Sequence, residues 1–106
     1  MTSIHRKELL DLLQQGVEIW NHWRQENPQV IPDLQKVDFQ GIDLRDADLS
    51  RANLSEADLS QAYLLDANLS EAHLRGANLN RACLIGANLS QAYLSDASLC
   101  NAYLFE

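Results

Sequence analysis

Leucine occupies every fifth position from residue 44 to residue 104, and from residue 47 to residue 102 an alanine stands two residues before each leucine. On an α-helix, five steps of about 100° turn the side chain by a net ~140°, so these leucines would not form one stripe. On a strand, a step of five places successive leucines on opposite faces of a sheet. A chain that turns once per repeat points every leucine to one interior, so the pattern predicts a solenoid.

The segment before the repeats has helical spacing instead. Its apolar residues recur at intervals of three and four, which predicts helix from residue 3 to about residue 26 with Thr2 or Ser3 as the N-cap. These apolar residues are Leu9, Leu12, Leu13, Trp20 and Trp23. Gly16 marks a kink or a break into two helices, and Asn27 before Pro28 ends the helical stretch because the residue before proline is disfavoured in the α region.

This helical segment has three possible roles: a membrane-surface anchor, a helix that binds a partner, or a lid on the end of the solenoid. The lid is favoured because the end of a solenoid exposes core and unpaired edges, and because the helix has no basic polar face for a membrane. Pro32, Val37 and Ile42 are bulkier than the later alanines, so we expect them to meet Trp20 or Trp23. We therefore divide the chain into a helical cap and connector over 1–36 and a repeat region over 37–106.

The repeat units read Ala47-Asp48-Leu49, Ala52-Asn53-Leu54 and onward to Ala102-Tyr103-Leu104. This motif resembles that of the pentapeptide-repeat family, and the segment from Gly16 to Pro28 is similar to the capping sequence of short cyanobacterial members. The resemblance implies a right-handed quadrilateral β-helix with leucine and alanine inward, about three and a half coils long, behind the N-terminal α-helical cap.

The outward positions provide a separate test of the number of sides. With four repeats per coil, residues twenty apart stack, and the position after leucine then forms the column Arg45, Leu65, Ile85 and Phe105. Three sides would instead stack residues fifteen apart and place Leu65 over polar residues. The alignment of apolar residues favours four sides.

On the same wall, the position before leucine runs Asp43, Tyr63, Cys83 and Tyr103. The two columns predict an apolar strip, defined here as Tyr63, Leu65, Cys83, Ile85, Tyr103 and Phe105. An exposed patch of this kind is typical of a protein contact, which we expect to be homodimeric. Alternatively, the N-terminal segment covers the strip, or the tyrosines simply pack on their neighbours. The C-terminal coil, for which the sequence shows no cap, is a second candidate for contact between two subunits.

The charge is -7 in total, and residues 37–106 carry -6 of it, with four basic and ten acidic side chains. An acidic wall repels duplex nucleic acid and anionic membranes, so we expect no direct binding to either. The N-terminus has neither a signal-peptide core nor a membrane span. Cys83 and Cys100 have no metal-ligand or disulfide spacing, which predicts free thiols in a cytoplasmic protein.

No catalytic arrangement, phosphate loop or cofactor motif is recognisable, so we predict a protein without enzymatic activity and without cofactors. Repeated aspartates suggest a calcium ladder, but glycine-rich turns are missing, and Asx turns account for the pattern better. These aspartates are Asp38, Asp43, Asp48 and Asp58. No metal site is therefore expected, and His73 beside Arg75 and Tyr93 is interpreted as ordinary polar surface.

Two functions follow from this pattern. The first is a structural or regulatory protein-protein interaction module whose rigid walls present side chains to an unidentified protein partner. The alternative, implied by the family's gyrase-binding members, is DNA mimicry. The expected rod of about 17 Å is short for a mimic, and its charges are sparser than the one per ~1.7 Å of duplex DNA.

Overall fold

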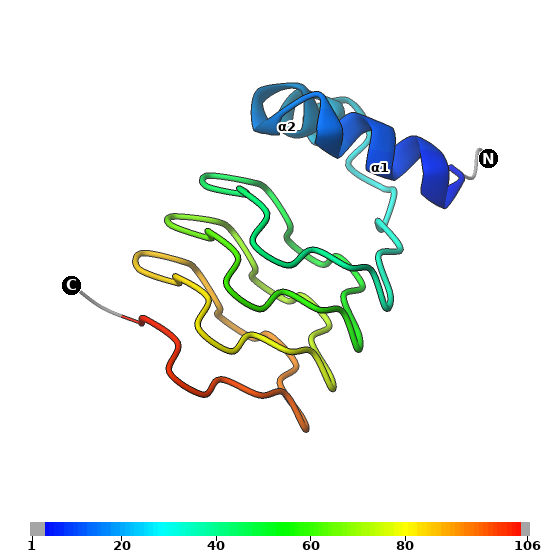
Figure 1. Cartoon of the computed structure of the whole chain (residues 1–106). Helices are drawn as coiled ribbons and strands as arrows, with labels where there is room; N and C mark the ends of the chain where they lie inside the picture. The colour runs from blue at the N-terminus through cyan, green and yellow to red at the C-terminus, as the bar shows by residue number, and fades with distance from the viewer. Residues whose placement is uncertain (1–3, 105–106) are drawn as a thin grey trace.

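The computed structural model describes residues 4–104, which form two short helices above a coiled solenoid (Figure 1). Helix α1 spans Arg6–Gln14 and helix α2 spans Val17–Glu26. The expected start at residue 3 is wrong: α1 begins at Arg6 with His5 as its N-cap, and Thr2 and Ser3 lie outside the described residues. The His5 N–H donates to the Glu8 carboxylate at 3.1 Å, which satisfies a donor that the helix itself leaves unpaired.

The helical segment breaks at Gly16 rather than kinking. Gly16 has a φ of 113°, a conformation that residues with a Cβ rarely adopt, and it is the N-cap of α2. The break lets α2 turn across the end of the solenoid. At the other end of α2, Asn27 is the C-cap, as expected for the residue before Pro28.

The solenoid consists of coils of twenty residues, because every parallel bridge joins residues twenty positions apart. The bridges run from Asp33–Asn53 to Cys83–Tyr103 and use the residue before each leucine. This register confirms four sides of one repeat each. Pairing begins at Asp33, four residues before position 37. Within residues 4–104 the pairing takes the form of isolated bridges, without longer strands, because a turn follows every leucine.

Each corner is a tight turn across the two residues after the leucine. The alanine N–H donates to the carbonyl of the preceding leucine, as from Ala47 to Leu44 at 3.0 Å, and the second turn residue has a positive φ. This geometry is that of a type II turn. Eleven of these positive-φ residues are not glycine. A residue with a side chain is less stable in the left-handed region by about 1–2 kcal/mol, so each of the eleven destabilises its turn by about that amount. The N–H groups of eight of them, from Lys36 to Arg81, bond to the next coil, as from Glu56 to the Arg75 carbonyl at 2.7 Å, which helps to hold the conformation.

The core is the column of inward leucines and alanines. Leucines from Leu44 to Leu84 and alanines from Ala47 to Ala82 are at most 2% exposed, which confirms the inward assignment. Leu9, Leu13 and Trp20 from the helices belong to the same buried cluster as Leu34, Val37 and Phe39. Neither helix within residues 4–104 combines the length and the apolar character needed to cross a membrane.

Candidate protein-interaction surfaces

The strip residues that the structure describes lie together on one wall. Bridges join Asp43 to Tyr63, Tyr63 to Cys83 and Cys83 to Tyr103, so these side chains occupy one column. Tyr63 and Tyr103 are 52% and 60% exposed. Leu65, Cys83 and Ile85 are half-buried. Phe105 lies outside the described residues. The wall therefore combines large exposed tyrosines with partly accessible aliphatic groups.

The top of this wall is polar because Asp43 and Arg45 form an ion pair. The Arg45 guanidinium donates to both Asp43 carboxylate oxygens, at 2.8 and 2.7 Å. This hydrogen bonding lowers the pKa of Asp43 and raises that of Arg45. Both side chains are more than half exposed, so the pair marks the limit of the apolar strip and contributes little to stability.

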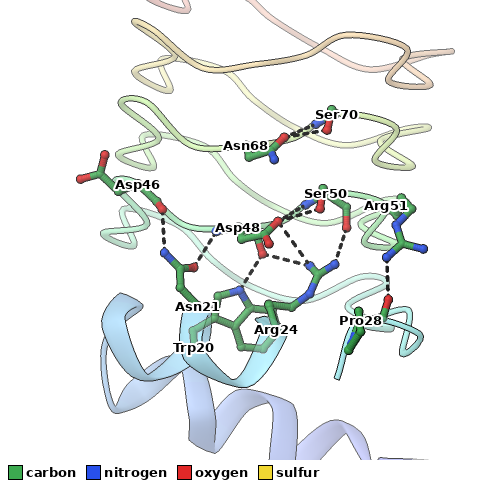
Figure 2. A network of polar contacts seen from close by, with 10 residues as sticks. All are labelled: Trp20, Asn21, Arg24, Pro28, Asp46, Asp48, Ser50, Arg51, Asn68 and Ser70. Atoms are coloured by element: carbon green, nitrogen blue, oxygen red, sulfur yellow. Dashed lines mark hydrogen bonds and ion pairs between the residues drawn. The ribbon is translucent and has the colours of Figure 1, made fainter. Parts of the chain in front are cut away.

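The second surface with a defined chemistry is the contact between α2 and the first coil (Figure 2). The Trp20 indole N–H donates to the Asp48 carbonyl at 2.8 Å. The Asn21 amide donates to the Asp46 carbonyl at 2.9 Å and accepts from the Asp48 N–H at 2.7 Å. The Asp48 N–H is a donor that a preceding coil would otherwise satisfy, so this amide side chain takes the place of that coil and adds a bond to the Asp46 carbonyl.

Arg24 completes this contact from a buried position, with 4% of the residue exposed. Its guanidinium donates to the Asp48 carbonyl at 2.9 Å and to the Ser50 carbonyl at 2.8 Å, and lies 3.9 Å from the Asp48 carboxylate. Burial lowers the pKa of Arg24, while Asp48 opposes that shift. The carbonyls of one wall of the first coil therefore meet a cation where the ladder lacks a coil above.

Trp20 is fully buried, whereas Trp23 is half-buried with its ring centroid 5.3 Å from that of Trp20. The two tryptophans were predicted from the sequence to make this contact, whereas Asn21 and Arg24 were not. The only available signal was spacing, since Arg24 follows Trp20 by four residues and so shares its helix face. A polar residue on a helix is normally expected to face solvent. The role of Arg24 therefore becomes visible only when the carbonyls that it contacts are located.

The repeated aspartates and asparagines make Asx turns. In nine repeats, the side-chain oxygen of the residue before leucine accepts the N–H of the residue after it, as between Asp48 and Ser50 at 3.1 Å. This agrees with the Asx interpretation of the pattern. Across residues 4–104, no group of three or more metal-ligating side chains is positioned around a common point.

Two further features are an aromatic pair and two cysteines, one of which, Cys83, belongs to the apolar strip. His73 stacks against Tyr93 with ring centroids 4.7 Å apart. Cys83 and Cys100 are free thiols, half-buried and exposed respectively. Neither feature gathers the groups that a catalytic site needs within the described part of the chain.

Comparisons with known proteins identify the class to which this solenoid belongs. The family model of pentapeptide repeats matches residues 52–91 and 82–106, which together make up just over half of the chain. The chain belongs to the pentapeptide-repeat family, and its fold is the right-handed quadrilateral β-helix with an N-terminal helical cap. No curated protein matches the chain.

Solved structures of family members are similar to it. The pentapeptide-repeat protein alr5209 from Nostoc PCC 7120 is 40% identical over 72% of this chain and 68% of its own length, with a TM-score of 0.50. HetL from Nostoc sp. strain PCC 7120, a protein involved in heterocyst differentiation regulation, is 37% identical over 68% of this chain, with a TM-score of 0.45. AT2G44920 from the Arabidopsis thaliana thylakoid lumen is 33% identical over 67% of this chain, also with a TM-score of 0.45. The matches cover only 40% of HetL and 52% of AT2G44920.

Proposed function

We propose that the protein is a non-enzymatic protein-interaction module that associates with a second copy of itself through the apolar strip. The observation that carries this proposal is the column of Tyr63, Cys83 and Tyr103, at a position where nine repeats have aspartate or asparagine. His73 and Tyr93 also depart from that pattern, but they stack on each other on another wall. These three side chains replace an Asx turn that nine repeats make. Replacing aspartate or asparagine with these residues removes a hydrogen bond from the turn and adds none. A contact with another molecule therefore explains these residues better than the structure of the turn does.

The choice of a second copy as the partner rests on charge and symmetry. Two chains of formal charge -7 repel each other unless they approach through a face with few charges. Below the Asp43–Arg45 pair, the two columns of the strip contain no Asp, Glu, Lys or Arg in the described residues. A two-fold axis near Cys83 and Ile85 would match the strip with itself, as a symmetric dimer interface requires. Exposed tyrosines suit such an interface because they contribute large contact area and a polar hydroxyl.

Sedimentation velocity over a range of protein concentrations tests this proposal. The wild-type chain is expected to dimerise, and Ile85→Glu is expected to remain monomeric because it places a carboxylate in the middle of the strip. Ser95→Glu is the matched control, since it adds the same charge at the equivalent position of the opposite wall and should dimerise as the wild type does. A monomeric wild type at about 100 µM, well above a micromolar Kd, would refute self-association.

The compartment follows from the thiols. We infer a cytoplasmic location, because the exposed Cys100 and the half-buried Cys83 are both unpaired and reducing conditions keep such thiols free. DNA mimicry has less support, since Asp38, Asp43 and Asp48 lie on three different walls of the coil. Absence of inhibition in a gyrase supercoiling assay at micromolar protein is the expected result.

A further inference from the structure

The upper edge of the first coil is capped unevenly. Inside the solenoid, the residue before each leucine bonds to the coil above through both backbone groups: the Asp58 N–H donates to Val37, and its carbonyl accepts from Phe39. On the first coil, Asp48 receives equivalent bonds from the side chains of α2. The cap therefore replaces a preceding coil on the wall that contains Asp48.

Two other walls of the same edge lack these substitutes. Among residues 4–104, no hydrogen-bond partner approaches the N–H or C=O of Asp38 or Asp43, or the C=O of Gln40 or Arg45. In the ladder below, the corresponding groups of Asp58 and Tyr63 are all bonded, including the N–H groups at 2.9 and 2.8 Å. An edge of this kind is a template for an added strand.

Grooves run beside this unpaired edge, between it and the helices. A groove of about 540 Å³ has an apolar lining that includes Leu10, Leu13, Val37, Phe39 and Ile42. A second groove, of about 680 Å³, adjoins it because Leu13 and Gln14 line both, and it extends past Asp43 and Arg45. Together they offer apolar contacts along the length of the edge.

The charge of the groove walls indicates which charge a bound peptide should have. Four carboxylates line the two grooves, from Glu18, Asp38, Asp43 and Asp46. The one cationic side chain in these linings, Arg45, is already paired with Asp43. A segment with basic outward residues therefore complements the walls, whereas an acidic segment is repelled.

We propose that a basic peptide segment of a partner protein, extended along each wall and turned once at the corner between them, binds in these grooves and pairs in parallel with the Asp38–Arg45 edge. Its backbone takes the place of the missing coil: two N–H groups reach the Asp38 and Asp43 carbonyls, and its carbonyls accept from the Asp38 and Asp43 N–H groups. Apolar side chains five residues apart, at the spacing of this chain's own leucines, enter the apolar lining. The site lies on the coil edge rather than on the apolar strip, so it is independent of self-association.

Amide hydrogen exchange followed by NMR on the full chain tests the free edge first. The Asp38 and Asp43 amides should exchange much faster than the Asp58 and Tyr63 amides, which occupy the same positions one coil further along. A blocked peptide of about ten residues, Lys-Ala-Lys-Leu-Ser-Lys-Ala-Lys-Leu-Ser, then serves as the probe. Its addition should slow exchange at Asp38 and Asp43. Unchanged exchange at both amides with bound peptide would overturn strand addition.

Fluorescence anisotropy with the labelled peptide measures the affinity and its origin. Asp38→Lys should weaken binding about tenfold or more, whereas Asp58→Lys should change it less than about twofold. Both substitutions remove one Asx turn and alter the net charge equally, and Asp58→Lys also removes the bonds from the Ser60 hydroxyl and the Gln40 amide. The control is therefore at least as disruptive to the fold, and it changes long-range attraction by the same amount. The same peptide N-methylated at its two leucines lacks the required donors and should not bind. Equal effects of the two substitutions, equal binding of the methylated peptide, or no binding at about 1 mM would refute the proposal.

Discussion

At the scale of single residues, the five positions of the repeat have separate tasks. Leucine and alanine fill the interior, the residue before leucine closes an Asx turn where it is aspartate or asparagine, and the two residues after leucine form the corner. Leu69 and Ser70 are adjacent yet differ completely in surroundings, since Leu69 is fully buried and Ser70 lies on the wall. Neighbouring substitutions should therefore have very different consequences.

Leu69→Ala should lower the free energy of unfolding by about 2–5 kcal/mol, because the rigid coils above and below cannot close the resulting cavity. Ser70→Ala removes only a hydroxyl that donates to Asn68 at 2.7 Å on the wall, so its effect should stay within about 1 kcal/mol. Urea denaturation of both variants measures the difference. Similar losses would contradict the inward assignment of leucine.

The wall residue Asp58 makes the stability of the fold depend on pH in the acid range. Hydrogen bonds from the Ser60 hydroxyl and N–H, and then from Gln40, lower the pKa of Asp58. Because the folded pKa lies below the ordinary value of about 3.9, the stabilisation is present above that value and is lost as the pH falls through the folded pKa.

Asp58→Asn keeps an oxygen for the Ser60 donors but has no proton to gain. Its free energy of unfolding should therefore fall less than that of the wild type between about pH 5 and pH 2. Urea titrations at several pH values across this range provide the comparison. Parallel curves for the two proteins would show that Asp58 does not contribute to acid sensitivity.

At the scale of elements, α2 serves as a partial replacement for a coil. Trp20 and Arg24 bring donors to carbonyls that the ladder leaves open, and Asn21 adds both a donor and an acceptor. The apolar side of α2 contributes to the core in the same contact. One helix face therefore covers the end of the hydrophobic core and also bonds to the open backbone groups of the first coil.

Arg24→Ala should lower the free energy of unfolding by about 2–4 kcal/mol, because it leaves the Ser50 carbonyl without its donor and removes a buried guanidinium that packs against the first coil. Arg51→Ala is the control: Arg51 is exposed and donates one bond to the Pro28 carbonyl at 2.7 Å. Its loss should cost less than about 1 kcal/mol. Thermal unfolding followed by circular dichroism ranks the two variants, and equal shifts in Tm would contradict the capping role of Arg24.

At the scale of the whole molecule, burial changes along the solenoid axis. Leucines near the cap have coils or helices on both sides, whereas Leu94 is half-buried and Leu104 is 49% exposed. Each coil contacts only its neighbours, so stability in a solenoid is close to a sum of local and nearest-neighbour terms.

Leu54→Ala should therefore destabilise this chain about twice as much as Leu94→Ala, since Leu54 is fully buried and Leu94 is not. Chemical denaturation of the two variants gives the comparison, with the wild type as reference. Equal losses would mean that the last coil is as well enclosed as the second.

Much of this architecture was predictable because it repeats. The spacing of leucine and the alignment of Leu65 with Ile85 indicate four sides from the sequence alone. The start of α1 was not predictable from Thr2 and Ser3, because several polar residues near the N-terminus offer caps of similar quality. The capping role of Arg24 was not predictable, because the sequence contains no information about which carbonyls face its side chain.

The sequence by itself determined the solenoid, its inward leucines and the column that places Tyr63 over Cys83, because these depend only on a period repeated along the chain. Tertiary structure alone decided which backbone groups of the first coil are satisfied. Asp48 lies under α2, while Asp38 and Asp43 do not, although all three residues have the same place in the repeat. The direction in which α2 crosses the coil separates them, and that direction results from packing between segments that are distant in the sequence.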